Sequence, residues 1–403
     1  MREDNHDVVT VVGVGAGGWS GSGGTPPGAL LAAEVVVGSA RQLDLLPAEV
    51  TAERIAWPSP LLPALPGLFE AQRGRAVCVL ASGDPMFHGI GATLARLLGG
   101  DRVRVLPHPS AVSLAAARLG WPLATTEVIS LVTAEVATLR RALNPGRRLF
   151  VLARDAGTPA EVAALLVAAG YGAATVTVLE QLGGPAERVY AAAAESWSPP
   201  PGDPLAVIAV ECGDGPRSSV VPGLADSAYR GDGQLTKREV RAVTLAVLEP
   251  VPGALLWDVG AGSGSIGIEW MRSHPSCRAI AVEPSSERVA TIRANAAALG
   301  VPGLRVVQGT APEALDGLPA PDTIFIGGGV TRDGVLDACL AALRPGGRLV
   351  ANAVTLESEA VLAAAYAKLG GELTRVAVNR ASPVGGFTGW RAMMPVTIWS
   401  VTR

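Results

Sequence analysis

The sequence has few charged residues and no long uninterrupted apolar segment. Charged residues make up 17% of its 403 residues, hydrophobic residues make up 49%, and mean hydropathy is +0.34. This balance excludes a disordered chain and predicts an apolar globular protein. Glu, Arg, Asp or Gly interrupts each apolar run before the roughly 18 residues that a membrane-spanning helix needs. The first residues, MREDNHDVV, lack the basic and apolar regions of an export signal, so we expect a cytoplasmic protein with no membrane partner.

Cysteine and histidine are also scarce, with four residues of each kind. The cysteines, Cys78, Cys212, Cys277 and Cys339, lie far apart without a C-x-x-C pair, so buried thiols are predicted. The histidines also lack ligand spacing, and we expect no metal. The formal net charge of −3 gives no support to nucleic-acid binding. The length exceeds one usual domain core and predicts two domains.

The first half alternates short β-rich runs with Ala- and Leu-rich stretches. The predicted strands are 8–14, 35–37, 75–80, 103–106, 128–132, 148–153, 175–179 and 205–210. The predicted helices are 90–98, 111–119, 135–143 and 159–169. This alternation indicates an α/β fold with parallel or mixed sheets. Turn-forming residues then break the pattern, so we expect a first domain at 8–212 and a linker at 213–233.

The second half, 234–403, restarts the alternation and shares no alignable repeat with the first. Its predicted strands are 254–259, 278–282, 305–308, 323–326 and 348–352, with helices such as 285–299 and 333–343. This order is typical of a doubly wound, Rossmann-like α/β sheet. Two late runs, 372–378 and 394–401, are predicted to form an antiparallel edge pair. Thr236 and Glu239 fit a T-x-x-E capping box, which predicts Thr236 as a helix N-cap.

The most informative segment runs from Asp258 to Glu269 and reads DVGAGSGSIGIE, between a predicted buried strand and a helix. Glycines there let the backbone approach a ligand closely and turn unpaired N–H groups toward it. Glu283 ends the next strand, where an acidic side chain binds the two hydroxyls of a ribose. The D-x-G-x-G-x-G spacing differs from the dinucleotide motif and favours S-adenosylmethionine. A glycine-rich turn without a ligand is the alternative.

Several segments that follow these strands should converge on one ligand. The residues expected to hold the amino-acid part of the cofactor are Gly260, Ala261, Gly262, Ser263 and Gly264. Thr310 and Ala311 follow the third strand, where backbone groups can contact adenine. Gly328 and Gly329 follow the fourth strand and leave open space beside the sulfonium for a large planar substrate.

Four motifs carry a resemblance to the cobalamin-pathway methyltransferases that decarboxylate and methylate a precorrin. They are LTKREVR at 235–241, the segment 258–269, GTAPEA at 309–314 and IGGG at 326–329. The resemblance implies a class I methyltransferase fold and a cofactor contact for Thr236. Lys237 and Arg241 are candidates for binding substrate carboxylates, although such residues also commonly lie on a solvated helix face.

The first half carries a different set of motifs and resembles the tetrapyrrole methylases over roughly 8–211. The motifs are VVGVGAGG at 11–18, ASGDPMFHGIG at 81–91, PHPSAVS at 107–113, TVLEQLG at 177–183 and ER at 187–188. That family has two α/β subdomains with S-adenosylmethionine in their cleft. Ala16 stands where the family's first loop has proline, and a Gly/Ser insert follows at 19–24.

The tetrapyrrole methylase resemblance also suggests site residues. Those implied to bind the cofactor are Gly83, Asp84, Ser110 and Ala111. Asp84 is also the candidate for orienting the reacting carbon, although Asp-Pro is a common turn former. His88 and His108 could carry a proton, or could be loop histidines without a role.

The fusion of two such domains implies a bifunctional enzyme of cobalamin biosynthesis with two S-adenosylmethionine sites, one per domain. Such an enzyme would methylate precorrin-6B at C-5 in the first domain. In the second it would methylate C-15 and decarboxylate the C-12 acetate, giving precorrin-8. The resemblance also implies a homo-oligomer formed through the second domain. A substrate with many carboxylates requires cations, for which the candidates are Arg41, Arg154, Arg332 and Arg391.

Three other functions remain as alternatives at this point. An RNA methyltransferase requires a basic face, which the charge of −3 opposes. A nucleotide-sensing binding module does not account for two unrelated cofactor folds in one chain. A nicotinamide oxidoreductase is disfavoured because neither loop has the dinucleotide spacing followed by its acidic residue.

Overall fold

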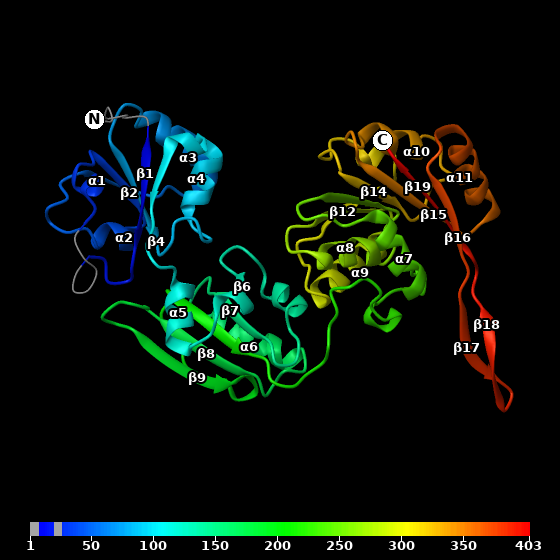
Figure 1. Ribbon diagram of the computed structural model, residues 1–403, viewed down its shortest axis with the longest axis horizontal. Coiled ribbons are helices and arrows are strands. Elements are labelled where there is room, and N and C mark those ends of the chain that lie inside the picture. The colour runs from blue at the N-terminus through cyan, green and yellow to red at the C-terminus, as the bar shows by residue number, and fades with distance from the viewer. Residues whose placement is uncertain (1–7, 20–25) are drawn as a thin grey trace. The chain divides into compact units, whose positions relative to one another are not determined.

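The computed structural model describes residues 8–19 and 26–403 (Figure 1). Its contacts divide the chain into unit 1, Met1–Val136 with Asn144–Pro216, and unit 2, Ala137–Leu143 with Arg217–Arg403. The division after Pro216 falls inside the predicted linker, and most of that segment packs with unit 2. Tyr229, for example, belongs to the core of unit 2. The N-terminal residues 1–7 and most of the predicted Gly/Ser insert lie outside the described residues.

Unit 1 begins with a parallel sheet of strand order β3-β2-β4-β1-β5. Its strands are β1 (Val9–Val14), β2 (Val35–Gly38), β3 (Glu53–Ala56), β4 (Val77–Ser82) and β5 (Val103–Leu106). Its helices are α1 (Gly28–Leu31), α2 (Ala40–Asp44), α3 (Leu61–Ala71) and α4 (Ile90–Leu98), followed by the 3-10 turn η2 (Gly100–Arg102). The central strands are valine-rich and buried on both faces, as expected where helices cover both sides of a parallel sheet.

The second sheet of unit 1 has the order β6-β7-β10-β8-β9 and is mixed, because only β6 and β7 are parallel. Its strands are β6 (Glu127–Ser130), β7 (Arg148–Leu152), β8 (Thr175–Glu180), β9 (Arg188–Ala193) and β10 (Ala206–Glu211). Its helical elements are α5 (Ala111–Leu119), α6 (Thr158–Ala168), η3 (Leu123–Thr125) and η5 (Ala194–Ser196). The segment η4 (Val136–Arg141) lies between β6 and β7 in the sequence, but all of it except Val136 belongs to unit 2. The helix predicted at 135–143 is wrong. It is the 3-10 segment η4, shortly before Pro145, which disfavours helical backbone at Asn144.

Unit 2 contains a seven-stranded sheet of order β13-β12-β11-β14-β15-β19-β16. Its strands are β11 (Leu255–Val259), β12 (Arg278–Glu283), β13 (Arg305–Gln308), β14 (Thr323–Ile326), β15 (Arg348–Ala353), β16 (Glu372–Val376) and β19 (Val396–Thr402). Its helical elements are η6 (Asp226–Ala228), α7 (Arg238–Leu248), α8 (Ser265–Ser273), α9 (Ser286–Ala298), η7 (Glu313–Leu315), α10 (Val335–Ala342) and α11 (Leu356–Leu369). The predicted antiparallel pair is confirmed, since β16 and β19 pair antiparallel at the sheet edge.

The core of unit 2 has two layers, one on each face of the sheet. Leu256 packs in one hydrophobic cluster and Leu255 and Trp257 pack in the other, because successive strand residues point to opposite faces. Strand order reverses beside β11: β12 and β13 lie on one side of it, and β14 and β15 lie on the other. The carboxyl ends of β11 and β14 therefore form a topological switch point, where open α/β sheets bind ligands.

A β-hairpin that was not predicted leaves the sheet between β16 and β19. Its strands are β17 (Asn379–Val384) and β18 (Phe387–Ala392), and Figure 1 shows it extending well beyond the sheet of unit 2. Within the described residues, no helix has the length and apolar character to cross a membrane. All four cysteines are buried and unpaired, as predicted.

Candidate functional site

A cavity of about 1120 Å³ opens at the switch point of unit 2. Its volume is above the roughly 300–1,000 Å³ typical of a site for one drug-sized ligand. The predicted residues that line it are Thr236, Lys237, Gly260, Ala261, Gly262, Ser263, Glu283, Thr310, Ala311, Gly328 and Gly329. The structure thus brings together segments that lie up to 93 positions apart, counted from 236 to 329.

The loop after β11 requires glycine for reasons of space and of backbone conformation. Gly260 has a φ of +70°, and a Cβ there would lie 2.8 Å from the backbone nitrogen of Gly328. The two glycine segments therefore touch backbone to backbone. Gly264 does not line the cavity. It is the N-cap of α8, with a φ of +77°, and a Cβ there would lie 2.8 Å from Cγ2 of Ile292.

Glu283 lies at the end of β12 with only 3% of its surface exposed, and it faces this loop. Its Oε2 accepts the backbone N–H of Gly262 at 2.9 Å, and its Oε1 accepts that of Ser285 at 3.2 Å. A carboxylate has about four acceptor positions, so each oxygen retains capacity for one further donor. The arrangement fits two ribose hydroxyls held beside the glycine loop.

Asp258, the first residue of the glycine motif, stabilises the start of the helix that follows the loop. Its Oδ2 accepts the backbone N–H of Gly267 at 2.9 Å, which satisfies one of the free N–H groups in the first turn of α8. Burial raises the pKa of Asp258 to about 7; the Gly267 hydrogen bond acts in the opposite direction, and nearby Glu283 raises it further. Because Asp258 does not line the cavity, it orients the loop from outside the site.

The start of α7 differs from the predicted capping box. The helix begins at Arg238, its N-cap is Lys237, and that residue makes no side-chain cap. Instead, Asp226 accepts the backbone N–H of Arg238 at 2.9 Å through Oδ1. Asp226, twelve positions before Arg238, therefore replaces a local N-cap, and Thr236 lies in the cavity wall.

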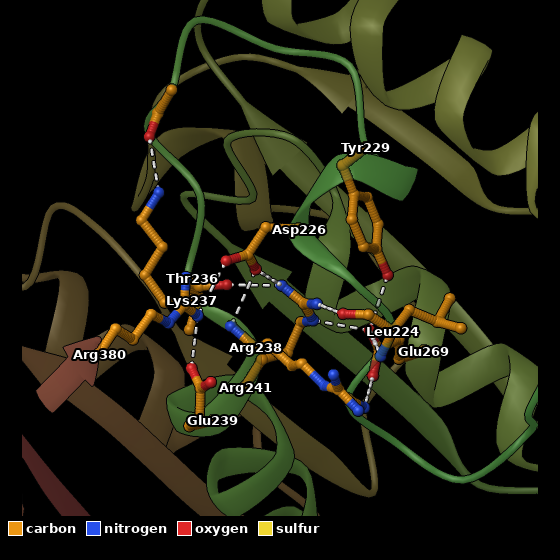
Figure 2. Close-up of polar contacts among 12 residues, drawn as sticks. Leu224, Asp226, Tyr229, Thr236, Lys237, Arg238, Glu239, Arg241, Glu269 and Arg380 are labelled. Carbon is orange, nitrogen blue, oxygen red and sulfur yellow. Dashed lines mark hydrogen bonds and ion pairs between the residues drawn. The ribbon is translucent and has the colours of Figure 1, made fainter. Parts of the chain in front are cut away.

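Arg241 was predicted to bind substrate carboxylates, and the structure contradicts this. Its side chain is fully buried and does not line the cavity. Figure 2 shows its polar contacts with the surrounding residues. Its Nε lies 2.6 Å from Oε1 of Glu269, an atom that also accepts the Tyr229 hydroxyl at 2.8 Å. Other guanidinium nitrogens donate to the carbonyls of Thr236 and Leu224. The positive charge is neutralised inside the protein, where Arg241 links the segment before α7 to Glu269 on α8.

A smaller cavity of about 190 Å³ lies in unit 1. The predicted residues that line it are Gly83, Asp84, Ser110, Ala111, His88, His108 and Ala16. Asp84 Oδ1 accepts the backbone N–H of Met86 at 2.9 Å, so this carboxylate also forms the predicted turn. Ser110 is the N-cap of α5, because its Oγ accepts the Ser113 N–H at 3.0 Å. The volume is below the roughly 300 Å³ at which such sites usually begin.

The four candidate arginines are divided between the cavities and the surface. Arg332 and Arg391 line the cavity of unit 2, and Arg41 lines that of unit 1. Arg154 lines neither and pairs with Asp155 and Glu161 at 3.1 and 2.9 Å. The hairpin, which was not predicted, adds Arg380 and Arg391 to one wall of the larger cavity. Its signal was the Gly385-Gly386 pair, a typical two-residue hairpin loop.

The two folds and their motifs define a two-domain methyltransferase, and the comparisons with known proteins agree. The model of the tetrapyrrole (corrin/porphyrin) methylases matches residues 8–196, and that of the precorrin methyltransferase domain matches 227–403. The chain is similar to the precorrin-6Y C(5,15)-methyltransferase [decarboxylating] of Mycobacterium tuberculosis strain CDC 1551, with 52% identity over 98% of this chain and 100% of the relative. A protein of the same name from Sinorhizobium sp is 48% identical over 98% of this chain and 96% of the relative.

A shorter relative matches less than half of the chain. The probable cobalt-precorrin-6B C(15)-methyltransferase (decarboxylating) of Pyrobaculum calidifontis is 36% identical over 44% of this chain and 94% of the relative. The long matches at about half identity settle the family. The chain belongs to the precorrin-6Y C(5,15)-methyltransferases [decarboxylating].

Proposed function

We propose that this chain methylates precorrin-6B at C-5 and C-15 and releases the C-12 acetate carboxyl as CO₂, giving precorrin-8 in cobalamin biosynthesis. The observation that carries the proposal is the 52% identity to a decarboxylating precorrin methyltransferase along 98% of the chain. An RNA methyltransferase is not favoured, because the matched relatives are precorrin enzymes and the net charge is −3.

The cavity of unit 2 fits S-adenosylmethionine. The loop Gly260–Gly264 would hold its amino-acid part, Glu283 its ribose and the backbone at Thr310 and Ala311 its adenine; these assignments follow from the cavity wall and from the free acceptor capacity of Glu283. When bound, the cofactor supplies a methyl group activated by a sulfonium.

The protein's own contribution in unit 2 is to orient two ligands and exclude water. Gly327, Gly328 and Gly329 leave the wall next to the cofactor loop without side chains, which makes room for a planar ring. A reduced tetrapyrrole carbon is already nucleophilic, and the ring can take up the electron pair that CO₂ leaves behind. Alignment of substrate and cofactor in an enclosed cavity is therefore the main requirement.

A second S-adenosylmethionine site in unit 1 is part of the same proposal. It rests on the family match at 8–196 and on the loops at Gly83, Asp84, Ser110 and Ala111 that line the smaller cavity. We assign C-5 methylation to this unit. C-15 methylation and decarboxylation are assigned to unit 2, because the match to the relative named for these two steps spans 184 residues, about the length of the precorrin methyltransferase domain at 227–403.

The deciding experiment supplies purified protein with precorrin-6B and methyl-labelled S-adenosylmethionine. We expect two labelled methyl groups and one CO₂ per tetrapyrrole, measured by mass spectrometry and CO₂ capture. Transfer of label to RNA, or no turnover by folded protein, contradicts the proposal.

We also propose that the enzyme is a homo-oligomer formed through unit 2. The support is the projecting hairpin, where Phe387 and Trp390 are 85% and 78% exposed. Contiguous exposed apolar surface marks interaction sites, and aromatic side chains are enriched in them.

A further inference from the structure

The wall of the larger cavity is strongly cationic. Its charged side chains are one carboxylate, Glu283, and five cations: Lys237, Arg288, Arg332, Arg380 and Arg391. Glu283 is already engaged with the backbone of the cofactor loop. The cavity therefore carries more positive charge than its own wall neutralises, which favours an anionic ligand.

Three of the five cations have acidic partners. Arg288 pairs with Asp232 at 2.7 Å, and Arg332 pairs with Glu313 at 3.1 Å. Arg380, at the base of the hairpin, pairs with Asp226 at 3.0 Å and with Glu239 at 2.5 Å (Figure 2). Lys237 and Arg391 differ from these three. Among the described residues, no acidic side chain forms an ion pair with either.

Arg391 has an unusual neighbour. In the register of the hairpin, Arg391 on β18 lies directly opposite Arg380 on β17, and both line the cavity. Like charges directly opposite each other destabilise a strand pair. Asp226 and Glu239 compensate Arg380, but nothing in this part of the structure compensates Arg391. An anion in the cavity would complete this arrangement.

The surroundings of Arg391 suit the edge of a large ring. Ala392, Met393 and Met394 continue the same cavity wall with apolar and flexible side chains. The volume of about 1120 Å³ leaves room for a second ligand beside a nucleotide cofactor. A planar guanidinium forms bidentate hydrogen bonds with a carboxylate, which fixes orientation as well as affinity.

We infer that Arg391 is a specificity-determining residue that binds a peripheral carboxylate of the tetrapyrrole substrate. The inference rests on the proposed function and adds the hairpin to the substrate site. Arg380 is a positioning residue in this scheme, because its pairs with Asp226 and Glu239 fix the hairpin base against α7. Arg391 thereby presents its charge at a fixed place in the wall.

The test measures steady-state kinetics of Arg391→Ala, Arg391→Lys and the full-length wild-type enzyme. Loss of one hydrogen-bonded charge predicts a KM for precorrin-6B that is about ten- to a hundredfold higher in Arg391→Ala. The kcat and the Kd for S-adenosylhomocysteine should stay within about threefold of wild type. Arg391→Lys should recover part of the loss, since it keeps the charge without the bidentate geometry.

Arg375→Ala is the matched control, because Arg375 is an exposed arginine of the same unit that pairs with Glu359 outside the cavity. Its KM should not change. An unchanged KM in Arg391→Ala overturns the inference. So does a tenfold weaker Kd for S-adenosylhomocysteine, which would assign Arg391 to the cofactor carboxylate. If the wild type does not turn over, the proposed function fails. Direct titration of precorrin-6B into the wild type and into Arg391→Ala still decides the role of Arg391.

Discussion

The absence of a side chain at Gly260 allows the loop after β11 to contact the loop after β14. The residue combines a φ of +70° with a backbone contact to Gly328 that no Cβ can enter. Gly328 is different, because a Cβ there would find its nearest neighbour, the carbonyl oxygen of Gly260, at an ordinary 3.8 Å. The two glycines face each other across the same contact, yet only one of them is required by geometry. They therefore make a matched pair for experiment.

Gly260→Ala should weaken S-adenosylhomocysteine binding by at least about tenfold and destabilise unit 2 by roughly 1–3 kcal/mol, since a left-handed backbone alone costs about 1–2 kcal/mol. Isothermal titration calorimetry and thermal unfolding measure the two effects. Gly328→Ala should bind the cofactor product with nearly wild-type affinity. Equal affinities in the two variants would contradict the role given to the loop contact.

Residue types alone did not separate arginines that line the cavity from arginines that are buried in the protein. Arg241 and Arg391 were both candidates for substrate carboxylates, and both lie in the second half of the sequence. Arg241 is buried against Glu269, an acid 28 positions away, whereas Arg391 is exposed in the cavity wall. Glu283 was easier to assign, because its place at the end of a strand is local information. The pairing of Arg241 depends on tertiary contacts, which cannot be predicted from residue spacing in the sequence.

At the scale of elements, the buried strands were predicted and the missed strands are largely exposed, although the exposed β16 was also predicted. The valine-rich β1, β2 and β4 were assigned from their apolar runs, but β3 and β9 were missed. Both missed strands are largely exposed, and β9 has the alanine-rich sequence RVYAAA with few β-branched residues. The hairpin β17–β18 was also missed, because its outward residues show no burial pattern to detect.

The hairpin gives a prediction about assembly. If Phe387 and Trp390 lie between subunits, the double variant Phe387→Ser, Trp390→Ser should shift the enzyme to a smaller species. Light scattering coupled to size-exclusion chromatography measures the change. Val221→Ser is the control, because Val221 is 70% exposed in unit 2 but lies outside the hairpin. A wild-type monomer, or an oligomer that survives the double change, would rule out assembly through this hairpin.

At the scale of the whole molecule, each unit has its own cavity, its own sheets and its own glycine-lined loops. Among residues 8–19 and 26–403, none lines both cavities, so a substitution in one loop should leave the other site intact. The number of cofactor molecules bound per chain can therefore distinguish the two proposed cofactor sites. A binding measurement avoids any dependence on the order in which the methyl groups are added.

Gly262→Arg places a long cation in the unit 2 loop, where φ is +59°, and Gly83→Arg does the same in unit 1, where φ is +63°. By titration calorimetry, wild type should bind two equivalents of S-adenosylhomocysteine, each single variant one, and the double variant none. Gly262→Arg should also release no CO₂ from precorrin-6B, because decarboxylation is assigned to unit 2. One equivalent in wild type would reduce the proposal to a single site, and CO₂ release by Gly262→Arg would reverse the division of labour between the units.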